Sequence, residues 1–236
     1  MTDGVAAREP DSGLGLAFLA VASGSADVIA FLMLGHVFAS AMTGNTALLG
    51  IAVSQGDMVA ASQPVTALIG FIAGAVLAAA IYNPKDSPLK LATVLRTLLL
   101  LEILCLGAFA ALWQIAGHPS GGPVHYSLIL LCSVAMGVQG VAAKRINAPG
   151  VNTIVFTSTV VAIVLSTTEI LLGRVDGPVI RSATKRQAAV FGAYGAGALI
   201  AGLLIWSKFP LLVWMPVAAV TLSLVCYELA QRRAAL

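Results

Sequence analysis

The chain has 236 residues, of which 59% are hydrophobic and only 10% are charged, and its mean hydropathy is +0.96. A soluble globular domain is roughly 45 to 50% apolar and about 25% charged, so the composition excludes a soluble fold and predicts an all-α, polytopic membrane helix bundle. The formal net charge of +3 does not indicate a nucleic-acid partner, because basic residues in a membrane protein mainly mark the loops that stay in the cytoplasm.

The N-terminal residues 1–13 mix acidic and basic side chains, and they lack the basic region and the small-residue cleavage site of a removable signal peptide. We therefore expect a cytoplasmic tail, followed by a first apolar segment that stays in the membrane. Six windows are long and apolar enough to cross a hydrocarbon core of about 30 Å. They are 14–35, 64–82, 91–115, 124–143, 188–206 and 211–229.

Two further segments are ambiguous, because 37–53 is short with a polar middle and 151–172 is rich in serine and threonine. If both crossed the membrane, the basic loop residues would be divided between the two faces. If each instead enters and leaves by the same face, Lys208 alone lies on one side. The other side then holds Lys85, Lys90, Lys144, Arg145, Arg174, Arg181, Lys185, Arg186, Arg232 and Arg233. The positive-inside rule favours this second arrangement and predicts six crossings, two broken or re-entrant segments and two cytoplasmic termini.

Six crossings divide the chain into two membrane repeats, 14–116 and 124–231, joined by an external loop at 117–123 and followed by a cytoplasmic C-terminus at 232–236. With three crossings each, the halves are inserted in opposite orientations and should form an inverted repeat. "GFIAGAV" (70–76) resembles "AYGAGAL" (193–199), and "MTGNT" (42–46) corresponds in position to "FTSTV" (156–160). Inverted repeats whose broken segments meet near the midplane are a recurring transporter plan.

Three stretches carry a resemblance to a known family: "HVFASAMTGNTALLG", "ALIGFIAGAVLAAA" and "MGVQGVAAKRINAPGVNTIVFTSTV". Together they resemble the YoaK-type family of bacterial inner-membrane proteins, whose function is unknown. The resemblance covers essentially the whole chain and implies six transmembrane helices in the bacterial inner (plasma) membrane. It also implies Gln-Asn and Thr-Gly-Thr in the second half, where this chain has Gln139-Gly140 and Thr157-Ser158-Thr159.

The first ambiguous segment carries a polar cluster at Thr43, Gly44, Asn45 and Thr46. Gly44 would permit a break, and Thr43 or Asn45 would cap a helix that resumes with Ala47. A helix N-terminus inside the bilayer presents free N–H groups and partial positive charge, which suit an anion or a polar oxygen. The alternative is that these side chains only form hydrogen bonds between helices.

Two acidic residues, Asp27 and Glu102, fall deep inside predicted spans. An acid at the bilayer centre costs about 2.5 to 3.5 kcal/mol on insertion scales, so it usually faces a partner or a water-filled cavity. The serines and glycine at 23–25 suggest a kink or a close helix contact beside Asp27. For Glu102, an ion pair with Arg96 or another helix and a proton-coupling role are both open.

Amides and hydroxyls also flank the second ambiguous segment, at Gln139, Asn152, Thr157 and Thr159. Their position suggests a counterpart of the first polar cluster, although hydrogen bonding between helices is the common role of such side chains.

Reactive groups are scattered in the sequence. The three cysteines lie singly in apolar segments, and the three histidines fall near segment ends or in loops. We therefore expect no disulfide, metal site or cofactor. With no nucleophile-elbow serine, P-loop or HExxH motif, we also expect no enzyme.

The sequence thus predicts a transporter or channel for a small polar or anionic solute, with a central site between the two broken segments. Its expected partners are the lipid bilayer and the solute, and a homo-oligomer is left open. The alternative is a structural or assembly protein that binds another membrane protein through the same segments. We assign the pathway to Asp27, Thr43, Gly44, Asn45, Thr46, Glu102, Gln139, Asn152, Thr157 and Thr159.

Overall fold

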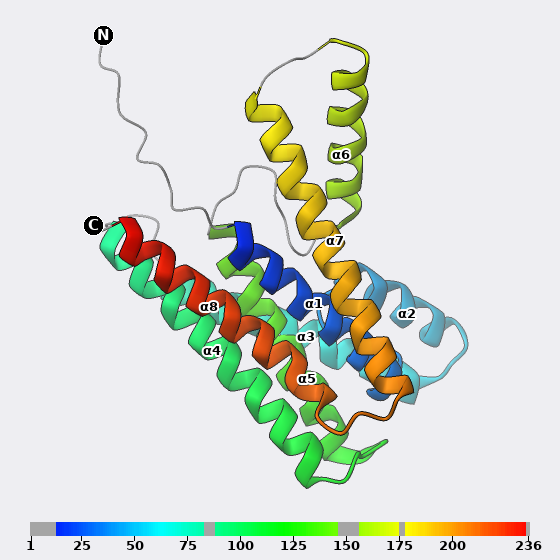
Figure 1. The fold of residues 1–236 in the computed structure, drawn as a ribbon. Coiled ribbons are helices and arrows are strands. Elements are labelled where there is room, and N and C mark those ends of the chain that lie inside the picture. Colours follow the sequence, from blue (N-terminus) through cyan, green and yellow to red (C-terminus); the bar gives the residue numbers. More distant parts are fainter. Residues whose placement is uncertain (1–12, 83–87, 146–155, 175–177, 235–236) are drawn as a thin grey trace.

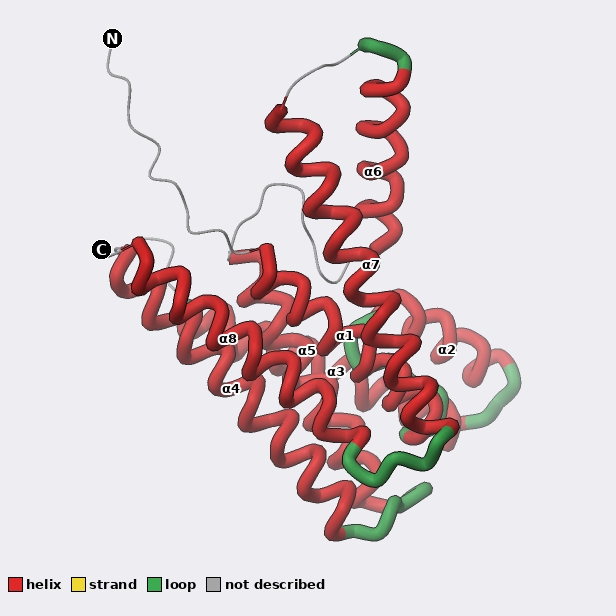
Figure 2. Tube along the Cα trace, viewed as in Figure 1, coloured by secondary structure: helices red, strands yellow, loops and turns green. Residues whose placement is uncertain are grey.

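A computed structural model describes residues 13–82, 88–145, 156–174 and 178–234. Their regular structure is entirely helical (Figures 1 and 2). In chain order the helices are α1 (Gly13–Met33), α2 (Met42–Ser54), α3 (Met58–Ile81), α4 (Pro88–Ile115), α5 (Gly122–Arg145), α6 (Phe156–Leu171), α7 (Pro178–Trp206) and α8 (Met215–Ala234), with a short 3-10 turn at Leu212–Trp214.

Six of these helices are long and apolar enough to cross a membrane, namely α1, α3, α4, α5, α7 and α8. This confirms the six predicted spans. The other two helices, α2 with 13 residues and α6 with 16, are shorter than the roughly 20 residues that a crossing requires. They correspond to the two ambiguous segments.

Two spans begin earlier than the sequence predicts. Asp57 caps α3 by accepting a hydrogen bond from the Ala60 N–H at 2.9 Å, and Pro64, the predicted start, lies inside the helix. α7 begins at Pro178 rather than at 188, so it includes the basic residues at 181–186. Hydropathy marks the part of a helix that lipid covers, and a helix can continue beyond that part wherever its backbone stays hydrogen-bonded.

The bundle has two inner helices, α1 and α5. Each has 61% of its most apolar stretch buried, against 17 to 39% for the other four spans. Helices α7 and α8 pack on α1, while α3 and α4 pack on α5. The short helices repeat this pattern, because α2 packs on α3 and α6 packs on α7. In Figure 1, α6 and the start of α7 stand apart from the bundle.

Glycines let the backbones of α1 and α7 touch. A Cβ atom on Gly24 would collide with the carbonyl oxygen of Tyr194, and one on Gly197 would collide with that of Val21. Each carbonyl belongs to the residue three positions before the opposing helix's own glycine. Helices inside lipid gain no hydrophobic driving force for association. Small residues favour association there because they let the helices pack in close van der Waals contact.

The crossing of α3 and α5 has the same construction. A Cβ on Gly74 would collide with the carbonyl of Val134, and one on Gly137 would collide with that of Phe71. The two inner helices therefore each hold one outer helix through a reciprocal pair of glycines.

The two ends of the bundle differ in side-chain chemistry. Exposed basic residues lie near the start of α4 and the end of α5, and near the start of α7 and the end of α8. All three tryptophans lie at the opposite end, Trp113 and Trp206 near the ends of α4 and α7, and Trp214 just before α8. Tryptophan favours the interface between lipid and water. We call these the basic end and the tryptophan end.

Replacing Gly197 by alanine should loosen the α1–α7 crossing, because the added methyl group meets backbone rather than a flexible side chain. Overpacking of this kind costs about 1 to 3 kcal/mol, and we expect a lower Tm in detergent, measured by circular dichroism. Gly195→Ala is the matched control, since nothing lies within 4 Å of its Cβ position and alanine is the better helix former. Equal Tm changes for the two variants would contradict the close crossing.

Candidate functional site

A buried carboxylate, Asp27 on α1, is the centre of the most connected polar cluster. The side chain is 1% exposed. Its Oδ1 accepts a hydrogen bond from the Ser40 backbone N–H at 2.6 Å, and its Oδ2 accepts from Ser40 Oγ and from Tyr194 Oη, each at 2.7 Å. These donors come from the α1–α2 linker and from α7, so one carboxylate ties three parts of the fold together.

Local backbone features place both donors on Asp27. Gly24, one turn before the carboxylate, allows α7 to approach so closely that the Tyr194 hydroxyl reaches it. After α1, Gly35 and His36 both adopt positive φ angles of 82° and 63°, a conformation that glycine tolerates and other residues rarely adopt. These two residues reverse the chain and bring Ser40 back beside α1.

A second polar side chain, that of Asn45 on α2, forms hydrogen bonds with the same linker. Its Oδ1 accepts from the Phe38 N–H at 2.9 Å and its Nδ2 donates to the Phe38 carbonyl at 2.7 Å. The Phe38 ring stacks on Phe31 with ring centroids 5.0 Å apart, and it lies where a Cβ on Gly44 would be. The backbone N–H and C=O of Phe38, in a largely buried linker, are thereby hydrogen-bonded inside the protein, as burial requires.

The predicted helix break within 43–46 is wrong. α2 begins at Met42 rather than at Ala47, and no side chain caps it at the N-cap residue Ala41. The predicted capping amide of Asn45 instead hydrogen-bonds backward to the linker. In that linker, Phe38 has a backbone N–H and a backbone C=O that would otherwise lack hydrogen-bond partners.

The N-terminal end of α2 already has an acidic side chain beside it. The carboxylate of Asp27 accepts from Ser40, two residues before the helix, where the partial positive charge of a helix end favours it. Thr43 and Thr46 are exposed on α2, and Thr46 Oγ1 donates to the Met42 carbonyl at 3.0 Å. These two hydroxyls do not join the Asp27 cluster.

Gln139 extends the cluster along α1. Its Nε2 donates to the Leu19 carbonyl at 2.9 Å and to Ser23 Oγ at 2.7 Å, and its buried Oε1 has no hydrogen-bond partner among the described residues. Ser23 and Asp27 are one helical turn, about 6 Å, apart on α1. We name Gln139, Ser23, Asp27, Ser40 and Tyr194 the Asp27 network.

Glu102 lies apart from this network, near the middle of α4. It is 0% exposed, and neither carboxyl oxygen has a hydrogen-bond partner within the described parts of the chain. Of the alternatives left open for Glu102, the ion pair with Arg96 is not formed, because Arg96 Nε contacts Glu228 Oε1 at 3.2 Å instead. That pair is partly exposed, so Arg96 keeps its charge in a wetter position than it would have beside Glu102.

The second polar segment contributes less to the described site. Asn152 lies outside the described residues, and so does the side chain of Thr157, whose backbone belongs to the first turn of α6. Thr159 is 3% exposed on the same helix, and α6 packs against α7. In the described chain, the central site is therefore built from α1, the first linker, α5 and α7.

Sequence reasoning missed Ser40 and Tyr194. A tyrosine in an apolar membrane helix has a hydroxyl that needs a hydrogen-bond partner. The hydroxyl of a serine just before a short polar segment needs a partner as well. Pairing them with Asp27 required knowledge of which helices cross at Gly24.

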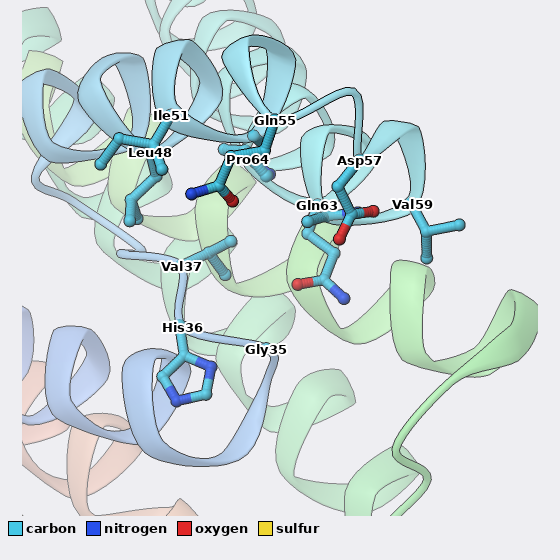
Figure 3. Close-up of a pocket in the computed structure, with 12 residues that line it drawn as sticks. Gly35, His36, Val37, Leu48, Ile51, Gln55, Asp57, Val59, Gln63 and Pro64 are labelled. Carbon is cyan, nitrogen blue, oxygen red and sulfur yellow. The ribbon is translucent and has the colours of Figure 1, made fainter.

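A pocket of about 420 Å³ opens beside the linker at the tryptophan end (Figure 3). It is lined by 35–37 of the linker, the second half of α2 and the start of α3. Its polar side chains include His36, Gln55, Asp57 and Gln63. The same linker therefore lines the pocket and, three residues later, donates to Asp27 through Ser40. No three His, Cys, Asp or Glu residues of the described ranges are grouped to hold a metal ion.

Residues 15–226 match the family model described as "Protein of unknown function (DUF1275)". The chain belongs to this family. The chain is also similar to a curated relative, the UPF0700 transmembrane protein YoaK of Bacillus subtilis (strain 168), which is 32% identical over 205 residues, covering 87% of this chain and 89% of the relative. No solved structure matches the chain. This DUF1275 member is therefore an integral membrane protein, and the description of its family names no solute.

Tyr194→Phe should destabilise this DUF1275 protein more than Tyr126→Phe. The first variant removes a donor from a buried carboxylate, which is worth about 1.5 to 3 kcal/mol, whereas the second removes a neutral hydrogen bond to Ser62 worth about 1 kcal/mol. Thermal unfolding in one detergent would compare them. A Tyr194→Phe protein as stable as the wild type would show that the phenol contributes nothing to holding Asp27.

Proposed function

We propose that this protein is a transporter or channel for a small polar solute, and that the Asp27 network is its central site. The observation that carries the proposal is a buried carboxylate bonded to a linker that also lines an open pocket. Acidic side chains inside membrane spans are costly and are usually retained for a substrate or ion path.

The polar groups follow α1 through the bundle. From the tryptophan end the order is the pocket, the linker at Ser40, Asp27, and then Ser23 with Gln139. The buried Oε1 of Gln139 has no partner in the described chain, so it is an acceptor that a solute can use. The linker lies between the pocket and Asp27, so we assign it the role of a gate that would open the pocket to Asp27.

Charge inside the bundle narrows the solute class. Among the described residues, Asp27 and Glu102 are the buried acids and no lysine or arginine residue is fully buried, although the Nε atom of Arg186 is. The sequence alone pointed to a polar or an anionic solute. Because an acid already occupies the position beside the α2 N-terminus, we propose a neutral or cationic polar solute, which the carboxylate does not repel.

We place the protein in the bacterial inner membrane with both termini in the cytoplasm. Basic loops remain cytoplasmic, and exposed lysines and arginines of α4, α5, α7 and α8 gather at the basic end, whereas Lys208 lies at the tryptophan end. This orientation opens the pocket beside the first linker to the outside of the cell.

We further propose that the two halves form an inverted repeat. The mirrored helix packing supports it, and so do the glycine crossings, because Phe71 and Gly74 occupy the same places in "GFIAGAV" as Tyr194 and Gly197 do in "AYGAGAL". The corresponding motifs "MTGNT" and "FTSTV" both begin a short helix, at Met42 and Phe156. Such repeats are the common scaffold of secondary transporters.

Flux into proteoliposomes tests the transport proposal. We expect entry of at least one neutral or cationic polar solute from a panel that includes neutral amino acids, sugars, amines and carboxylic acids, measured against protein-free vesicles. No flux of any class, combined with stoichiometric co-purification of another membrane protein, would favour the structural or assembly role instead.

Asp27→Asn should reduce that flux at least about tenfold, since a 1.4 kcal/mol loss of solute binding already corresponds to a factor of ten. Glu169→Gln is the control, because Glu169 is an exposed acid on α6. Size-exclusion profiles and Tm values would establish that both variants fold. Wild-type flux in folded Asp27→Asn protein would remove Asp27 from the site.

A further inference from the structure

Glu102 is the one buried acid whose carboxyl group is without a hydrogen-bond partner in the described chain. It lies near the middle of α4, on the face that also carries Leu98 and Leu106 one turn to either side, and both leucines are 0% exposed. By its position along the helix, the carboxyl is as far from either membrane face as this span allows.

The helices that pack against α4 offer Glu102 no counter-charge. These elements are α5, α8 and the turn at Leu212–Trp214. Their described titratable or charged side chains are His125, Tyr126, Cys132 and Lys144 on α5, and Cys226, Tyr227, Glu228, Arg232 and Arg233 on α8, with Lys90, Arg96 and Cys105 on α4 itself. None of these described side chains forms a hydrogen bond or ion pair with Glu102, and Arg96 and Glu228 pair with each other.

An ionised carboxylate cannot remain in such a place without a cation, because desolvation of an unpaired charge costs far more than its neutralisation. A metal cation needs several oxygen ligands, whereas the buried residues within one turn of Glu102 on α4 are the apolar Leu98, Leu99 and Leu106. A proton needs only the carboxylate itself. The apolar surroundings therefore select a proton over a metal ion.

We propose that Glu102 is a proton-binding site and that the proton is the coupling ion of transport. In the conformation described, the carboxylate has taken one proton from the aqueous phase and is a neutral carboxylic acid. It releases that proton only when a rearrangement of α4 against α5 and α8 brings water to it. The coupling part rests on the transport function proposed above, whereas proton binding does not.

Asp27 provides the internal contrast. Three donors converge on its two oxygens, and a carboxylate that accepts several hydrogen bonds is stabilised in its charged form. Asp27 therefore fits a fixed site for the solute, and Glu102 fits a carrier of protons.

Infrared difference spectroscopy of the purified protein in lipid nanodiscs tests proton binding. We expect a carbonyl-stretch band of a neutral carboxylic acid that persists at neutral pH, shifts on 13C-glutamate labelling and is lost in Glu102→Gln. Glu228→Gln is the matched control, because this partly exposed glutamate on α8 pairs with Arg96, and its replacement should leave the band in place.

Two outcomes would overturn the proton site: a band unchanged in Glu102→Gln, or no glutamate-derived neutral band in the labelled wild type at neutral pH. The labelling experiment needs no variant, so it decides the question even if Glu102→Gln fails to fold.

Flux measurements test the coupling separately. With a solute that enters wild-type proteoliposomes, an imposed inward proton gradient should drive accumulation, and Glu102→Gln should retain equilibration but lose the gradient-driven accumulation. Accumulation that survives in Glu102→Gln overturns the coupling. An absence of wild-type flux overturns the transport function while the infrared result still decides proton binding.

Discussion

The rest of the structure depends on the need to satisfy one carboxylate inside a membrane bundle. Asp27 accepts hydrogen bonds from the α1–α2 linker and from α7, and an unpaired charge in its place would be costly. The linker can turn back toward α1 because Gly35 and His36 adopt positive φ angles, and α7 can approach because Gly24 has no side chain. The position of α2, the wall of the pocket and the α1–α7 crossing are thus linked through the hydrogen bonds of Asp27.

The helix packing of the two halves is more symmetric than their buried polar side chains. Reciprocal glycine contacts join α1 to α7 and α3 to α5, but the position in α3 that matches Tyr194 of α7 is Phe71, which has no hydroxyl. The residue of α5 that matches Asp27 by its distance from the crossing glycine is Gly140. On the repeat proposed here, the described residues therefore hold such a buried carboxylate on the first inner helix and none at the matching position of the second. The second half contributes Gln139, which donates to α1.

Features with a strong local cause were predictable from the sequence. The six spans follow from apolar length, and the close contact beside Asp27 follows from Gly24 between two serines. The start of α2 was not predictable. Asn45 is a residue type that often caps helices, but here its side-chain amide forms hydrogen bonds with the backbone N–H and C=O of Phe38 instead. The partner of Arg96 was left open by the sequence, since the choice between Glu102 and Glu228 depends on helix rotation and on access to water. Tyr194 was missed because its role depends on which outer helix crosses α1.

The Asp27 network also limits how the gate can open. Moving the linker away from α1 breaks both bonds from Ser40, and hydrogen bonds to a charged group are worth about 1.5 to 3 kcal/mol each. A ligand can shift such an equilibrium only by binding the open state better than the closed one. A solute with N–H or O–H donors can replace Ser40 on the carboxylate, whereas one with acceptors alone leaves the charge unpaired. The closed network therefore selects for hydrogen-bond donors in whatever displaces it.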